Sequence, residues 1–306
     1  MNELQSYIQN YLDFCQYQKR LDSKTLKAYR IDLSQFCTKT NVSSIADITS
    51  QILEDYIASL HQEYKPKTAK RKIAAVKALF SYLEYKDLTG SNPFNKIHVK
   101  FREPVILPKT IPLQTIEHLL SAIYQQRTEA KTNYRKKNAL RDAAIIELLF
   151  ATGMRISKLC LLDVESVNLY DRTILIYGKG SKERKVQIGN DDVVSIFERY
   201  KADFWAEIQS CGHFFANQNG KELSDQAVRR MLNRNTSLAS INLHITPHMF
   251  RHTFATSLLE ADVDIQYIQE ILGHSSINIT EIYTHVAMSK QRDILTTKHP
   301  RKDFQI

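Results

Sequence analysis

The sequence contains no apolar segment long enough to span a bilayer, which takes about 20 mostly apolar residues. Its first ten residues are polar and lack the pattern of a signal peptide, a positive start followed by an apolar stretch. Glycine and proline are few, 8 and 7 in 306 residues, and no low-complexity tract occurs. We therefore expect a soluble, cytoplasmic protein without membrane contacts, long enough for two domains.

Cysteine is scarce, and the four cysteines form neither a Cys-x-x-Cys pair nor a disulfide framework. We expect small buried thiols in a reducing compartment instead. The sequence also lacks the Gly-x-x-x-x-Gly-Lys-Ser/Thr phosphate loop and any cluster of carboxylates suited to magnesium. No cofactor and no metal site are therefore predicted.

Positive charge is in excess along the whole chain, with a net charge of +9. Residues 1–105 and residues 106–306 are both basic, so the excess is not a tail. Basic proteins suit phosphate polyanions, although many of them bind no nucleic acid. One polyanionic ligand that touches both halves is a reasonable expectation.

The first 88 residues have the apolar spacing of four amphipathic helices, whose apolar positions run over 4–15, 26–36, 52–60 and 73–83. Ser23 and Thr49 are suitable N-caps for the second and third. Four such helices predict a small bundle. Residues 89–105 then combine Gly, Pro, Lys and Arg, which indicates a basic linker between two domains.

The start of the fourth helix is crowded with basic side chains. Either they form a solvated face, or they form an edge that contacts DNA phosphates, helped by the positive end of the helix. The residues predicted to bind DNA are Lys67, Thr68, Lys70, Arg71 and Lys72.

Residues 106–306 read as mainly helical with one interruption by short strands. The strands are expected at 166–169, 173–177 and 184–188, joined by tight turns. A polar, basic stretch at 126–138 is either an exposed loop or a helix extension. A helix from 139 to 150 is expected to end at Thr152-Gly153.

Four short segments hold residues that could handle a phosphodiester. Arg155 follows a helix-ending glycine, and Arg can bind two phosphate oxygens at once. Lys179 lies between two glycines of a hairpin. His248 and Arg251 share a face at the positive end of a helix that Pro247 begins. Each segment alone is also compatible with an ordinary surface role.

The fourth segment is Leu272-Gly273-His274, with Tyr283 nine residues after His274. The order Arg, hairpin Lys, His-x-x-Arg, Leu-Gly-His and Tyr resembles the tyrosine recombinase (phage integrase) family, especially its Xer-like branch. The resemblance covers nearly the whole chain. It implies a mainly α fold with a small antiparallel β-sheet (α+β): a four-helix core-binding (SAM-like) domain at 1–88, the linker, and a tyrosine recombinase catalytic domain at 106–306.

The resemblance also implies a role for each matching residue. Tyr283 is similar to the nucleophile that forms a 3′-phosphotyrosyl link to DNA. His248 is its acid–base partner, and His274 donates a hydrogen bond to the same phosphate. Arg155 and Arg251 hold the non-bridging oxygens, and Lys179 protonates the 5′-oxygen.

One position departs from the family pattern, which commonly has an acidic residue three after the first arginine, where this chain has Lys158. The lysine is either a plain surface change or a loss of support for the site. Lys182 and Arg184, close to Lys179, are predicted to contact phosphate as well, although solvation of the hairpin would also account for them.

Two other functions remain compatible with these residues: a type IB topoisomerase, and a DNA-binding relative with weakened catalysis. The helical first domain and the segment after Tyr283 favour a recombinase. The family relation implies double-stranded DNA as the partner and a tetramer in synapsis, with the C-terminal tail docked on a neighbouring protomer. The target sequence cannot be read from the chain.

Overall fold

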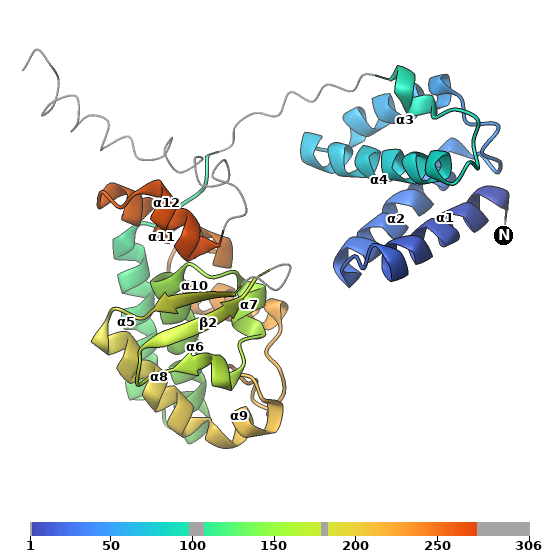
Figure 1. The fold of residues 1–306 in the computed structure, drawn as a ribbon. Coiled ribbons are helices and arrows are strands. Elements are labelled where there is room, and N and C mark those ends of the chain that lie inside the picture. Colours follow the sequence, from blue (N-terminus) through green and yellow to red (C-terminus); the bar gives the residue numbers. More distant parts are fainter. Residues whose placement is uncertain (1, 98–106, 179–182, 274–306) are drawn as a thin grey trace, which may run out of the picture. The chain divides into compact units, whose positions relative to one another are not determined.

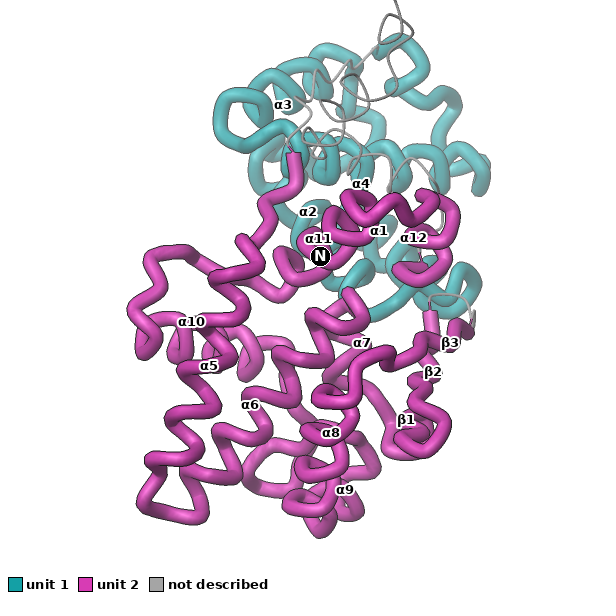
Figure 2. Tube along the Cα trace, turned by 90° about the vertical axis from the view of Figure 1, so that its left-hand side faces the viewer, with its two compact units in different colours: residues 1–105 teal, residues 106–306 magenta. Residues whose placement is uncertain are grey.

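The computed structural model describes residues 2–97, 107–178 and 183–273. The chain divides into two compact units, residues 1–105 and 106–306 (Figure 2). The predicted fold class, mainly α with a small antiparallel sheet, is confirmed (Figure 1). Among the described helices, none combines the length and apolarity needed to cross a bilayer.

The first unit is a bundle of four helices, as predicted. They are α1 (Glu3–Asp13), α2 (Ser23–Thr40), α3 (Ser50–Glu63) and α4 (Pro66–Tyr85), and a π-helical turn, Phe14–Gln18, extends α1. Thr49 caps α3, but the N-cap of α2 is Asp22 rather than Ser23. The Asp22 carboxylate accepts a hydrogen bond from the Thr25 backbone N–H at 2.9 Å, which places Ser23 inside the first turn.

The core of this unit gathers apolar side chains from all four helices, among them the fully buried Leu33, Phe36 and Phe80. A 3₁₀ turn, Pro93–Lys96, adds to it from the stretch predicted to be a linker. Its Phe94 is buried, with its ring 5.7 Å from that of Phe80. The chain therefore stays packed against the first unit for some residues beyond α4.

A buried carboxylate, Asp32 of α2, holds the basic start of α4. Lys72 Nζ lies 3.1 Å from Asp32 Oδ1, hydrogen bonds to Gln35 and stands 4.9 Å from the centre of the Tyr64 ring. Arg71 also pairs with Asp32. Lys72 is only 3% exposed, because its ammonium compensates the buried carboxylate, so its position suits the packing of α2 against α4 rather than the predicted DNA contact.

The second unit contains the other helices and the sheet. After α5 (Leu113–Glu129), α6 (Asn133–Thr152) and α7 (Ile156–Cys160) come β1 (Val167–Asn168), β2 (Thr173–Tyr177) and β3 (Glu183–Gln187). The remaining helices are α8 (Asp191–Asp203), α9 (Trp205–Cys211), α10 (Asp225–Leu238), α11 (Pro247–Glu260) and α12 (Ile265–Leu272). The basic stretch at 126–138 is almost entirely helical, since only residues 130–132 separate α5 from α6.

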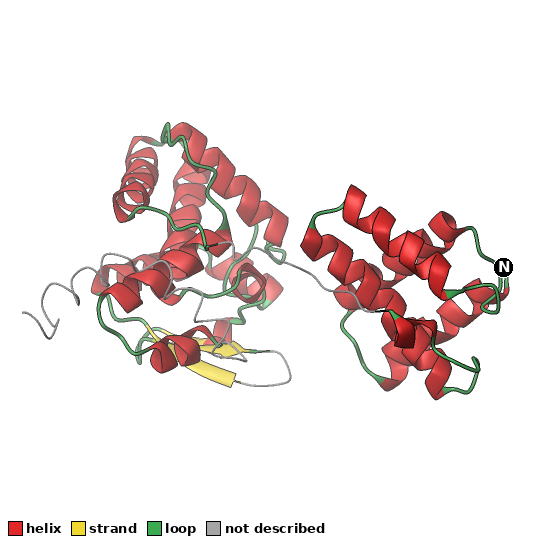
Figure 3. Ribbon diagram, turned by 90° about the horizontal axis from the view of Figure 1, so that it is seen from above, coloured by secondary structure: helices red, strands yellow, loops and turns green. Residues whose placement is uncertain are grey.

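The sheet has the antiparallel order β1-β2-β3, with Ile174 paired to Val186. Ile174, Ile176 and Val186 are buried, and the sheet lies along one side of the helices (Figure 3). At the centre, α6 packs against α5, α7, α8 and α11, and nearly all of its last three turns is buried. This helix therefore carries its C-terminal end into the middle of the unit.

We expect Asp32→Ala to destabilise the first unit by about 3 kcal/mol, because it leaves Lys72 buried without its counter-charge. Faster amide hydrogen exchange in α2 and α4 of the full chain would measure this loss. Adding Lys72→Met should restore most of the protection. Asp55→Ala is the matched control, since Asp55 is exposed and hydrogen bonds to Gln51 within α3. Equal effects of the two single variants would contradict the role given to Asp32.

Candidate active site

Gly153 ends α6 in the left-handed conformation, with φ +57°, and lies at a crowded corner. A Cβ atom there would stand 2.7 Å from Phe254 Cδ1 and 2.9 Å from Leu272 Cδ2. Glycine is needed both for the backbone conformation and for the close approach of α11 and α12. The turn places Arg155 two residues later, as the N-cap residue of α7.

Arg251 fixes this corner from α11. Its side chain is buried, 4% exposed, and its Nη1 donates a hydrogen bond to the carbonyl oxygen of Gly153 at 2.8 Å. Its Nη2 donates to the carbonyl oxygen of Leu272 at 2.9 Å. The carbonyls are at the C-terminal ends of α6 and α12, where helices leave carbonyl groups unpaired and carry partial negative charge. One guanidinium therefore joins the ends of three helices.

Arg184 of β3 lies beside Gly273, the residue that ends α12 in the left-handed conformation. Burial, and then the nearby charge of Arg155, lowers the pKa of Arg184 to about 10. Its Nε and Nη2 atoms are buried, and no hydrogen-bond partner from the described residues reaches them. Arg155 and Arg184 thus form a pair of neighbouring cations, one from a helix start and one from a strand.

His248, in the first turn of α11, adds a group that can exchange protons. Partial desolvation lowers the pKa of this imidazole, and the charges of Arg229, Arg251 and Arg155 lower it further, while Asp225 opposes them. Its side chain nevertheless keeps contact with solvent. Since an ordinary histidine has a pKa near 6.5, His248 is neutral at pH 7 and can accept a proton.

Arg229 and Asp225, both on α10, are neighbours of His248 that the sequence analysis did not name. No motif marks either residue. Arg229-Arg230 looks like an ordinary pair on the polar face of an amphipathic helix. Only the packing of α10 in the second unit shows which of these two arginines acts on His248.

Of the predicted catalytic residues, the structure describes Arg155, His248 and Arg251, and it brings all three together. Lys179, His274 and Tyr283 lie outside the described residues, as does Lys182 of the predicted DNA-binding set. His274 nevertheless directly follows Gly273, so the chain enters that segment at the Arg251 corner. Lys158, on α7, is half-buried, and the described part of the chain provides no carboxylate that pairs with it.

The basic start of α4 belongs to the first unit and stands apart from this cluster in the sequence. Lys67, Lys70 and Arg71 are exposed there, and Thr68 is half-buried. Arg71 remains accessible although it pairs with Asp32, since 47% of its side chain is exposed. These four residues keep the accessibility that a phosphate contact needs, in contrast to Lys72.

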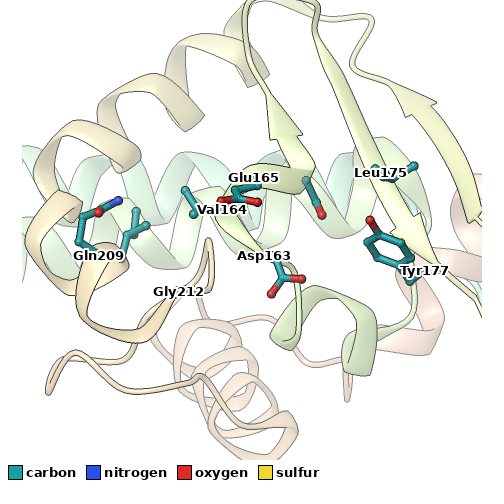
Figure 4. Close-up of a pocket in the computed structure, with 9 residues that line it drawn as sticks. Asp163, Val164, Glu165, Leu175, Tyr177, Gln209 and Gly212 are labelled. Carbon is teal, nitrogen blue, oxygen red and sulfur yellow. The ribbon is translucent and has the colours of Figure 1, made fainter.

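A pocket of about 540 Å³ lies elsewhere in the second unit and contains none of the predicted residues. Figure 4 shows Asp163 and Glu165 in its lining, with Tyr177 and Gln209. Carboxylates repel phosphate, so this pocket does not suit a DNA backbone. Within residues 2–97, 107–178 and 183–273, no three His, Cys, Asp or Glu side chains gather as metal ligands would.

We expect Gly153→Ala to destabilise the second unit by about 1–3 kcal/mol more than Gly212→Ala, because only the former adds a clash to the backbone strain. Gly212 also has a positive φ, +73°, but a Cβ there would meet nothing within 4 Å. The single tryptophan, Trp205, belongs to this unit, so its fluorescence during urea unfolding of the full chain compares the two variants. Equal losses would mean that the corner adapts to a methyl group.

Family comparisons agree with the motifs and the geometry. The model of the phage integrase family matches residues 114–290, and that of the phage integrase N-terminal SAM-like domain matches residues 8–86. A tyrosine recombinase of Agathobacter rectalis is 66% identical over 304 residues, 99% of each chain. Tyrosine recombinase XerC of Bacillus subtilis is 30% identical over 309 residues, 98% of each chain.

Solved structures share the fold. The XerH recombinase bound to its difH substrate after cleavage aligns with a TM-score of 0.75 at 23% identity, covering 94% of this chain and 83% of that one. The Tn1549 transposon integrase in complex with transposon end DNA aligns with a TM-score of 0.68 at 21% identity, over 96% and 99%. With the family models matched across both units, this chain belongs to the phage integrase family of tyrosine recombinases.

Proposed function

We propose that this protein is a site-specific recombinase that cuts and rejoins DNA strands through Tyr283. The observation that carries the proposal is the group of residues around Arg251, which binds the ends of α6 and α12. Arg155 and a neutral His248 lie close to it, and His274 directly follows the end of α12 in the sequence. Two cations and a proton acceptor at one point suit a phosphodiester, whose negative charge grows as it is attacked.

In the proposed reaction, the Tyr283 oxygen attacks the scissile phosphorus and the bond to the 5′-oxygen breaks. His248 takes the phenolic proton, since a phenol with a pKa near 10 is a poor nucleophile at neutral pH. Lys179 gives a proton to the departing 5′-oxygen, and His274 donates a hydrogen bond to the phosphate. Arg155 and Arg251 stabilise the charge on the non-bridging oxygens.

The covalent 3′-phosphotyrosine preserves the phosphodiester as an ester of the enzyme. A 5′-hydroxyl from a second strand can therefore attack it, release Tyr283 and restore the DNA backbone in the exchanged arrangement. The step needs no nucleotide hydrolysis, because one phosphate ester replaces another. Arginine and lysine side chains supply the positive charge that the reacting phosphate requires.

The proposed partner is double-stranded DNA that contacts both units. The exposed residues at the start of α4, with Lys182 and Arg184 of the second unit, would bind its phosphates. The similarity of the fold to that of recombinases bound to DNA supports this partner. We further propose a tetramer on DNA, joined by the C-terminal tail (288–300), and a cytoplasmic location.

The first test of the proposed chemistry replaces the nucleophile. DNA trapped covalently by the protein in cells can be sequenced, and a nicked duplex carrying the recovered site then serves as substrate. In the presence of EDTA, Tyr283→Phe should bind this duplex with unchanged affinity and form no SDS-stable adduct. Tyr267→Phe, on the exposed face of α12, is the matched control and should form the adduct at the normal rate. An adduct with Tyr283→Phe would assign the nucleophile elsewhere.

The second test concerns the proton acceptor. Arg229→Ala removes a charge that lowers the pKa of His248, so that pKa should rise and the imidazole should protonate at a higher pH. As the pH decreases, the variant should lose cleavage activity at a higher pH than the wild type, because protonated His248 cannot take the phenolic proton. NMR titration of the imidazole and the pH profile of adduct formation measure both effects. Arg230→Ala should change neither, and a similar shift in both variants would contradict the assignment.

A further inference from the structure

The Arg184 guanidinium presents an unpartnered hydrogen-bonding edge. Nε and Nη2 form the side of a guanidinium on which two N–H bonds are parallel, the arrangement that suits two oxygen atoms of one phosphate. Both atoms are buried here without a hydrogen-bond partner in the part of the chain that the structure describes. Buried donors are costly to leave unpaired, so a native structure that keeps two on one charged side chain needs a reason.

The opposite side of this guanidinium is held by the backbone at Gly273. A Cβ built on Gly273 would clash with Arg184 Nη1 and stand 3.1 Å from Cζ. The absence of a side chain at Gly273 therefore makes the space that the guanidinium occupies. Because Nη1 is turned to Gly273, the edge formed by Nε and Nη2 is the one left for a ligand.

The charges around Arg184 indicate the sign of that ligand. Arg155 is close enough to disfavour the charged form of Arg184. In the described parts of the chain, no carboxylate lies within ion-pair distance of either guanidinium. Two neighbouring cations without a counter-ion repel each other, and an oxyanion between them would remove both this repulsion and the unpaired donors.

We propose that Arg184 is a third arginine of the catalytic site, which binds the non-bridging oxygens of the reacting phosphate together with Arg155. This inference rests on the proposed function, since it takes the cluster at Arg251 to be the place of strand cleavage. It goes beyond a general DNA contact because the ligand is the one phosphate that Tyr283 attacks. Arg251 then shapes the site through its two carbonyl contacts and shares the charge of this phosphate with Arg155 and Arg184.

The decisive experiment changes the charge of the phosphate as well as the protein. Arg184→Ala should slow adduct formation about 100-fold on a normal duplex, the cost of losing one donor to a developing oxyanion. If the scissile phosphate is replaced by a neutral methylphosphonate, the variant and the wild type should react at similar rates, because the charge that Arg184 balances is gone. If Arg184 only supported the fold, its replacement by Ala would slow adduct formation by the same factor on both substrates.

Two variants control this comparison. Lys185→Ala removes the exposed neighbouring cation on β3 and should leave the rate of adduct formation unchanged on both substrates. Arg184→Lys keeps the positive charge but lacks the two parallel N–H donors. Its rate of adduct formation on the normal duplex should therefore lie between the rates of the wild type and of Arg184→Ala. A parallel loss on both substrates with Arg184→Ala would overturn the inference. Failure of the wild-type protein to form an adduct with either duplex would instead overturn the proposed function.

Discussion

The architecture of the catalytic unit depends on the two hydrogen bonds that Arg251 donates to the carbonyls of Gly153 and Leu272. They tie the end of α6 and the end of α12 to the start of α11. Each helix end is followed or preceded within a few residues by a proposed functional group: Arg155, His274 and His248. A single buried cation therefore fixes the helix ends beside Arg155 and His248, which are about a hundred residues apart in the sequence. Helix ends have unpaired carbonyls and are natural acceptors for it.

The same positive charges that suit the phosphate also prepare the proton acceptor. His248 is partly desolvated and faces the charges of Arg229, Arg251 and Arg155, with Asp225 opposing them, which gives a bias toward the neutral imidazole. The charge of the bound phosphate would offset part of it, since an anion favours the protonated imidazole. In the proposed reaction, substrate binding and proton uptake by His248 would therefore be coupled.

Much of the fold follows from local sequence signals, and much of the site does not. The four helices of the first unit, the three strands and the end of α6 at Gly153 were predictable because apolar spacing and a helix-ending glycine act locally. The segment at 126–138 was ambiguous, since a polar helix extension has no apolar stripe. Arg229 and the unpartnered edge of Arg184 could not be predicted, because each depends on a neighbour brought close only by tertiary packing: His248 for the first, Gly273 for the second.

Lys72 and Arg184 show which basic residues belong to the fold and which are available to a ligand. Both look alike in the sequence, as cations in a basic stretch. Lys72 is compensated by Asp32, which is fully buried and 40 residues away, so its charge serves the packing of α2 against α4. Among the described residues, the charged neighbour that acts on Arg184 is another arginine, Arg155. A buried cation with a carboxylate is electrostatically complete, whereas a cation without one remains costly until an anion arrives. For Lys72 and Arg184, a counter-charge among the described residues therefore distinguishes the cation that serves the packing from the one that we propose to bind phosphate.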